Sequence, residues 1–154
     1  MKEIVNKLIK KNKTISTMES CTGGGVANAI TNIEGASEVL MFSAVTYSNL
    51  YKIKMGVSSD IIDKYSVYSP ETAMEMSKKI SNFSNSNYGI GITGKLNRID
   101  KNNLFGSDNL VHISIYDRDN NKFYNTSINV FEKTREENKR LVIDEIIKQL
   151  NIIL

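Results

Sequence analysis

A chain of 154 residues, 40% of them hydrophobic, is long enough to bury one core and too short for two ordinary domains, so we expect a single domain over residues 1–154. The formal charge of +3 comes from 20 basic and 17 acidic residues, and the basic residues are scattered among acids, which argues against nucleic acid as the main partner. One cysteine and one histidine exclude an internal disulfide and a Cys/His zinc site, and they fit a reducing, cytoplasmic location. Residues 1–13 mix charged and polar residues into their apolar positions, so we expect neither a secretory signal nor a membrane span.

The first third of the chain predicts a helix, a strand and the start of a second helix. Apolar residues recur at helical spacing in the first nine residues, and the basic run Lys10–Lys13 ends that helix. Thr14–Met18 is rich in β-branched residues and contains no breaker, which indicates a strand. The stretch "ESCTGGG", residues 19–25, follows where this strand gives way to a run of small residues with helical character.

The middle of the chain predicts a second strand and three helices. Val39–Tyr47 is almost continuously apolar, which is typical of a strand in the interior of a sheet. Asn49–Met55 and Ser59–Tyr65 are two short helical segments. A longer helix begins at Ser69-Pro70-Glu71, where serine caps the helix and proline fits its first turn; the expected buried face of this helix consists of Ala73, Met76, Ile80 and Phe83.

The remaining residues predict a buried strand, a loop, a hairpin and a final helix. Tyr88–Thr93 is the strand, and the polar segment Lys95–Asn109 is the loop. Leu110–Tyr116 and Phe123–Phe131 flank "DRDNNK" as the hairpin. The final helix, Thr134–Ile153, has an expected buried side of Leu141, Ile143, Ile146, Ile147 and Leu150. Because helices and strands alternate with one late hairpin, we expect a three-layer α/β/α sandwich on a mixed, mostly parallel sheet of about five strands.

The glycine-rich segment Ser20–Gly25 is the first candidate for chemistry. In α/β sheets, ligands collect at the carboxyl ends of strands, where the next helix presents unpaired amides. Glycines let these amides approach a phosphate or the oxyanion of an acyl transfer. The spacing matches neither the dinucleotide fingerprint G-x-G-x-x-G nor a P-loop.

A reactive serine needs a base, and the sequence offers two. His112, the only histidine, falls inside a predicted strand with no acid to orient it, so a structural role is the better interpretation. Lys52 lies just past the strand that ends at Tyr47, and adjacent parallel strand ends would bring Ser20, Tyr47 and Lys52 together. To act as a base near neutral pH, the lysine pKa must fall from about 10.4 to about 7 or 8, which burial or a nearby cation can cause.

Each of these residues also has a plainer reading. Ser20 is in the position of a helix N-cap, and Tyr47 has the character of a sheet-packing residue. Cys21 is an alternative nucleophile, because thiolates form readily at helix starts. Glu19 either orients the loop or the lysine, or is a buried acid paired with backbone amides.

Several motifs together resemble one known family. These are "ESCTGG" at residues 19–24, "VTYSNLYK" at 45–52, "GV" at 56–57, "YSPETAMEM" at 68–76, "ITG" at 92–94 and an arginine, Arg135, opening the last helix. The combination is similar to the C-terminal domain family of CinA, whose enzymatic (PncC-like) members are nicotinamide mononucleotide amidohydrolases. The likeness runs over nearly the whole chain.

The resemblance implies an enzyme that hydrolyses the carboxamide of a small-molecule mononucleotide with no metal or organic cofactor. It assigns Ser20 as nucleophile, Lys52 as base and Tyr47 as the residue that supports the proton transfer or positions the lysine. It further implies contacts to the oxyanion or the substrate from Glu19, Cys21, Thr22, Gly23, Gly24, Thr93, Gly94 and Arg135. It also suggests a homo-oligomer, with Met41, Phe42 or the final helix at the interface.

One segment departs from the family pattern. Family members continue after Thr-Gly with Ala-Gly-Pro and a glycine- and proline-rich stretch, whereas this chain has "KLNRIDKNNLFGSDN", Lys95–Asn109. The departure supports a second hypothesis, a catalytically degenerate nucleotide-binding or assembly module of the same fold. A third hypothesis is a helper in DNA uptake or damage response. Only the name of the family suggests it, and the scattered charge does not support it.

Overall fold

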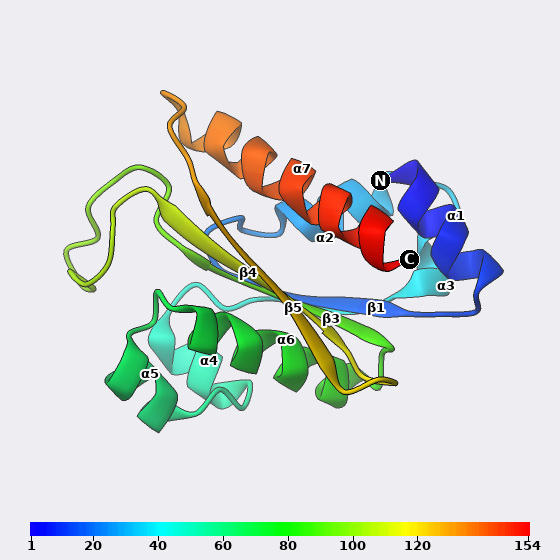
Figure 1. The fold of residues 1–154 in the computed structure, drawn as a ribbon, viewed down its shortest axis with the longest axis horizontal. Helices are drawn as coiled ribbons and strands as arrows, with labels where there is room; N and C mark the ends of the chain where they lie inside the picture. Colours follow the sequence, from blue (N-terminus) through cyan, green and yellow to red (C-terminus); the bar gives the residue numbers. More distant parts are fainter.

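A computed structural model describes all residues, 1–154, and shows a five-stranded sheet between two layers of helices (Figure 1). The strands are β1 (Ile15–Glu19), β2 (Leu40–Val45), β3 (Tyr88–Gly94), β4 (Leu110–Asp117) and β5 (Lys122–Asn129), in the spatial order β2-β1-β3-β4-β5. β2, β1 and β3 are parallel, and β4 and β5 run antiparallel to their neighbours. The expected three-layer sandwich on a mixed sheet is therefore confirmed.

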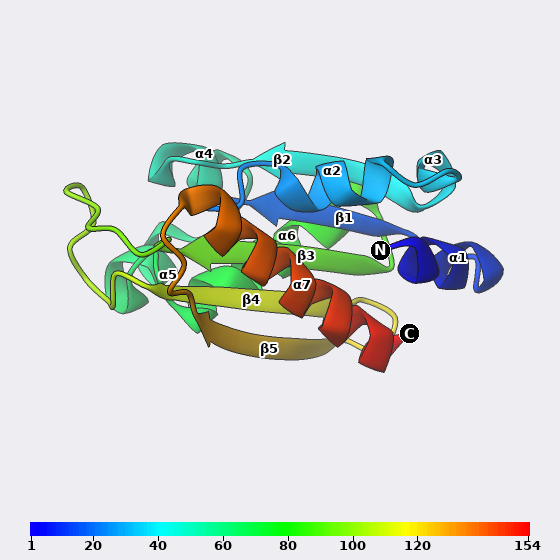
Figure 2. The ribbon, with the colours of Figure 1, turned by 90° about the horizontal axis from the view of Figure 1, so that it is seen from above.

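The helices divide between the two faces of the sheet (Figures 1 and 2). One face carries α1 (Lys2–Lys10), α2 (Gly25–Thr31), α3 (Ala36–Val39) and α7 (Arg135–Ile153), and the other carries α4 (Asn49–Lys54), α5 (Ser59–Tyr65) and α6 (Pro70–Ser84). The larger core, 20 buried residues, lies under α1, α2 and α7, and a smaller cluster of six lies under α5 and α6. No helix is both long and apolar enough to cross a membrane.

Local sequence explains why the two longest helices begin where they do. Ser69 caps α6, because its Oγ accepts a hydrogen bond from Thr72 N at 3.1 Å. Thr134 and Glu137 form a capping box at the start of α7, each side chain bonding the other's backbone amide. The segment between β3 and β4 contains no helix or strand, as the polar stretch predicted.

Three expectations about burial are wrong. β2 is an edge strand and not an interior one, with Met41 53% and Val45 51% exposed, because the strand order leaves one side of it unpaired. Phe83 lies on the outer side of α6, 65% exposed, and packs against the ring of Phe42. Leu141 is exposed, whereas Ile146 and Leu150 are fully buried as expected, and Asn138 and Val142 complete the buried stripe of α7.

Candidate active site

A cavity of about 590 Å³ opens beside the carboxyl ends of the parallel strands, where ligands collect in α/β sheets. Its lining comes from the β1–α2 connection, the segment around α4, the residues before α6, the loop 95–109 and the start of α7. The sequence-predicted residues among them are Ser20, Cys21, Tyr47, Lys52, Gly94 and Arg135.

Ser20 and Lys52 meet at the inner wall of this cavity. Ser20 follows β1 directly and still bonds β3 through its amide, which donates to Ile92 O at 3.1 Å. Lys52 lies in α4, and its Nζ donates to Ser20 Oγ at 3.1 Å and to the carbonyl oxygen of Thr46 at 2.7 Å. Residues from two neighbouring strand ends therefore share one hydrogen-bond system.

The environment of Lys52 favours the neutral amine. The residue is only 1% exposed, and no carboxylate lies within salt-bridge distance of its Nζ. Burial lowers the pKa of the ammonium to about 8, although the negative charge of Asp100 opposes the shift. With a pKa of about 8, roughly a tenth of the amine is unprotonated at pH 7, far more than for an ordinary lysine.

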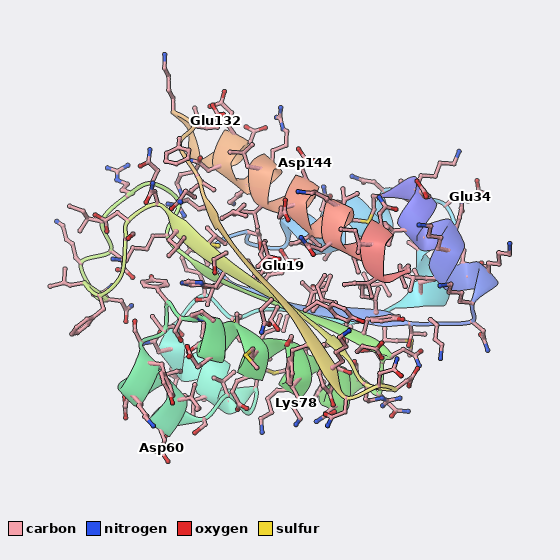
Figure 3. The ribbon with its side chains drawn as sticks, in the orientation of Figure 1. Glu19, Glu34, Asp60, Lys78, Glu132 and Asp144 are labelled. Carbon is pink, nitrogen blue, oxygen red and sulfur yellow. The ribbon has the colours of Figure 1, made fainter.

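Glu19 holds the glycine-rich connection in place through hydrogen bonds to its carboxylate. The side chain lies in the interior of the molecule, whereas Glu34 and Glu132 lie at its periphery (Figure 3). Its Oε2 accepts hydrogen bonds from Thr22 Oγ1 at 2.7 Å and from the amides of Gly24 and Val26 at 3.1 Å. Its Oε1 accepts from Thr17 Oγ1 and from Ala27 N. The carboxylate thus occupies the helix-start amides itself, so Glu19 is a positioning residue with no free lone pair for a substrate.

These bonds decide which amides remain for an oxyanion. Gly24 N is bound to Glu19, and Gly23 N donates to Ser20 O at 3.0 Å. The amides of Cys21 and Thr22 donate to no acceptor within the protein. Thr22 is buried and does not line the cavity, so the amide of Cys21, and not a glycine amide, is the available donor beside Ser20.

Tyr47 makes no hydrogen bond with the lysine. Its hydroxyl accepts a hydrogen bond from a guanidinium nitrogen of Arg135 at 3.1 Å, and both side chains are exposed at the cavity mouth. The partners of Lys52 Nζ do not include it. The expectation that Tyr47 positions the lysine is corrected: the backbone carbonyl of Thr46 does so, and Tyr47 pairs with Arg135.

Five expected contact residues do not line the cavity: Glu19, Thr22, Gly23, Gly24 and Thr93. Thr93 is fully buried, and its Oγ1 donates to Val67 O at 2.8 Å. Their direct contacts with a substrate are therefore not supported by the arrangement. They hold the backbone around Ser20 and β3 instead.

Sequence reasoning missed the residues on the outer wall. Asp100 accepts hydrogen bonds from the hydroxyl of Tyr68 and from Asn103 Nδ2, and Asn103 Oδ1 accepts from Asn49 Nδ2. These contacts join the loop 95–109 to the start of α4 and to the residue before the α6 cap. The only signal was the motif "YSPETAMEM", which includes Tyr68 without indicating its partner.

The competing nucleophile and base are less suited to chemistry than Ser20 and Lys52. Burial raises the pKa of the Cys21 thiol to about 12, so it stays protonated near neutral pH. His112 Nδ1 shares a hydrogen bond with Ser127 Oγ at 2.8 Å within the β4–β5 pair and does not line the cavity. No group of three or more His, Cys, Asp or Glu side chains is placed to hold a metal ion.

Fold and site together define an α/β sandwich protein with a buried serine–lysine pair at the carboxyl ends of its parallel strands. The chain belongs to the CinA C-terminal domain family, whose family model matches residues 1–154.

Individual relatives agree with this assignment. A CinA-like protein of Kosmotoga olearia is 45% identical over 92 residues, which are 59% of this chain and 22% of that protein. This chain thus spans about a fifth of the length of the curated relatives it matches. The solved structure of a competence/damage inducible protein of Agrobacterium tumefaciens is 28% identical with a TM-score of 0.82, covering 97% of this chain and 94% of that one. A CinA superfamily protein of Escherichia coli shares the fold, with a TM-score of 0.90 at 23% identity, covering 99% of this chain and 87% of that one.

Proposed function

We propose that this protein is an amidohydrolase that converts nicotinamide mononucleotide to nicotinate mononucleotide and ammonia, with Ser20 as nucleophile and Lys52 as general base. The observation that carries the proposal is the 3.1 Å contact between Lys52 Nζ and Ser20 Oγ inside the cavity. Burial that lowers the pKa of Lys52 to about 8 gives the amine the basicity that a neutral-pH base requires.

The first half of the reaction forms an acyl-enzyme. The neutral amine of Lys52 takes the proton of Ser20 as Oγ attacks the carboxamide carbon, and the resulting oxyanion accepts a hydrogen bond from the amide of Cys21. The lysine then returns its proton to the carboxamide nitrogen, the C–N bond breaks, and ammonia leaves. Ser20 is left as an ester of the nicotinate carboxyl group.

The second half uses the same residues on water. Lys52 takes a proton from the water that attacks the ester carbon, and returns it to Ser20 Oγ as the C–O bond breaks. The carboxylic acid product is released, and the serine and the neutral amine are restored. Thr46, whose carbonyl oxygen holds the lysine at 2.7 Å, keeps Nζ directed at the serine through both halves.

Ammonia release from nicotinamide mononucleotide tests the proposal. Ser20→Ala and Lys52→Ala are expected to lower kcat by about 1,000-fold or more, because the nucleophile and its base act as a unit. Lys54→Ala is the matched control, since Lys54 is an exposed lysine in the same helix. Cys21→Ala is expected to retain activity.

The same assay separates the enzyme from the non-catalytic module. The loop 95–109, which departs from the family pattern, is the feature that favours the module. If wild type, Ser20→Ala and Lys52→Ala release ammonia equally or not at all, while calorimetry shows mononucleotide binding that survives Ser20→Ala, the protein is a binding module and the amidohydrolase proposal is wrong.

A further inference from the structure

We propose that Arg98, on the loop 95–109, is a specificity residue that binds the phosphate of the amide substrate together with Arg135. The proposal rests on the proposed function, since it concerns which amides the site accepts. Arg98 lies in the segment 95–109, whose sequence differs from the family pattern, so its contribution is expected to be specific to this protein.

Two guanidinium groups line the cavity without an acidic partner. The side chain of Arg98 makes no hydrogen bond or ion pair within the protein, and Arg135 bonds only the uncharged hydroxyl of Tyr47. By contrast, Arg140 lies outside the cavity and pairs with Glu136 at 3.5 Å. The cavity therefore holds two cations that are free to meet an anion.

The single acidic residue in the lining does not neutralise them. Asp100 accepts hydrogen bonds from the hydroxyl of Tyr68, from Asn103 Nδ2 at 3.0 Å and from Asn102 N at 2.9 Å. These donors are neutral, so the carboxylate keeps its charge. Lys95, Arg98 and Arg135 line the same cavity and outnumber it, so the field inside the cavity remains positive and favours an anionic ligand.

The loop is built to present Arg98 at the cavity. The amide of Arg98 donates to Asp108 O at 3.0 Å and closes the loop across its base. Lys95, only 3% exposed, fills the interior of the loop, and its Nζ donates to Asp108 Oδ1 at 3.0 Å. Asn103 ties the far side of the loop to Asn49 at 3.2 Å. Arg98 therefore extends from a segment that is anchored on both sides.

The chemistry of a guanidinium indicates which anion fits. Its planar set of N–H donors matches phosphate oxygens in a bidentate arrangement, and the bond is strengthened by charge. Arginines from two different elements, the loop and the start of α7, would hold one phosphate from two directions. The site is thus expected to prefer an amide that carries a phosphate over the same amide without it.

The ratio of kcat/KM for nicotinamide mononucleotide to that for nicotinamide riboside measures this preference. Arg98→Gln is expected to lower the ratio by about 10-fold or more, because the loss on the mononucleotide exceeds any loss on the riboside. Arg98→Lys should restore part of it, because a point charge replaces the bidentate donor. Arg140→Gln, which removes an arginine outside the cavity, should leave the ratio at the wild-type value.

Calorimetry separates this inference from the proposed reaction. Nicotinate mononucleotide and nicotinate riboside are titrated into Ser20→Ala protein with and without Arg98→Gln. If wild type releases no ammonia but the mononucleotide binds more tightly than the riboside and loses that advantage in Arg98→Gln, the reaction is wrong and the phosphate site stands. If Arg98→Gln changes neither the kinetic ratio nor the affinity difference, the assignment of Arg98 is overturned whatever the activity.

Discussion

At Lys52 the proposed function and the stability of the fold oppose each other. The ammonium of Lys52 is buried beside the hydroxyl of Ser20 and the carbonyl oxygen of Thr46. Both partners are neutral, so they offset less of the lost hydration energy than a carboxylate would. The fold therefore disfavours the protonated form, which is the same property that makes the amine a base. Burying this lysine therefore lowers the stability of the protein at every pH at which the unfolded chain would keep the proton.

The stability of the wild type is therefore expected to rise with pH in the alkaline range. The folded pKa is about 8 against an ordinary value of 10.5, so the penalty is fully present below pH 8 and disappears as pH rises towards 10.5. The shift corresponds to about 3 kcal/mol of unfolding free energy.

Urea unfolding of wild type and Lys52→Met across pH 7.5–10.5 should show the wild type gaining about this amount of unfolding free energy relative to the variant. Lys54→Met, which changes an exposed lysine, should follow the wild type; a constant gap between wild type and Lys52→Met would contradict the assigned pKa.

Some of the site is predictable from residues alone, and some is not. The meeting of Ser20 and Lys52 follows from sequence because both sit next to the ends of strands that parallel pairing brings to one edge. The pairing of Tyr47 with Arg135 depends on side-chain direction at two exposed positions 88 residues apart, which no local pattern encodes. Glu19 lies next to Ser20 in sequence, yet its carboxylate accepts hydrogen bonds from the helix-start amides of Val26 and Ala27.

At the scale of elements, the packing of α6 on β3 explains the alternation in "YGIGIT". The isoleucines Ile90 and Ile92 face the larger core. The glycines face α6, where a Cβ on Gly89 would lie 2.0 Å from Ser77 O and one on Gly91 2.2 Å from Ala73 O. The helix backbone therefore rests directly on the strand, and this contact fixes the segment before α6 that lines the cavity.

Gly91→Ala is expected to lower the unfolding free energy by about 3 kcal/mol or more, because the methyl group meets helix backbone that cannot move alone. Gly25→Ala is the matched control. Its Cβ would meet the flexible end of Ile143 at 3.0 Å, and its position at the start of α2 favours alanine, so a change within about 1 kcal/mol is expected. Urea midpoints measure both, and equal effects would show that the helix does not rest on β3 as described.

The limits of sequence prediction at this scale also concern β2. Its apolar residues correctly predicted a strand, and their continuity wrongly predicted an interior position. An unbroken run of apolar residues indicates only that the side chains on both faces of a strand are suited to burial. It does not indicate whether another strand of the same chain or another molecule buries them. The order of strands is set by the crossovers, which no single segment encodes.

At the scale of the whole molecule, the unpaired edge of β2 exposes apolar side chains that no other part of the chain covers. The exposed side chains of the β2 edge surface are Met41, Phe42, Val45, Leu50, Tyr51 and Ile53, and no residue from 39 to 51 is charged. Edge strands of isolated molecules are usually protected by charge, proline or a covering segment. We propose that a second copy of the chain covers it, because an uncharged edge that meets its own copy across a twofold axis encounters no like-charge repulsion.

The double variant Phe42→Lys/Val45→Lys is therefore expected to be monomeric where the wild type is a dimer. It places two like charges opposite their copies at the twofold axis, where desolvating them is costly. Both positions are exposed in the single chain, so the circular dichroism and the melting of the monomer should be retained. Phe131→Lys, at an exposed phenylalanine away from β2, is the control and should stay dimeric. Light scattering coupled to gel filtration at about 100 μM, the concentration of a nucleotide-binding protein titration, measures all three. A monomeric wild type would contradict the proposal that a second copy covers this edge.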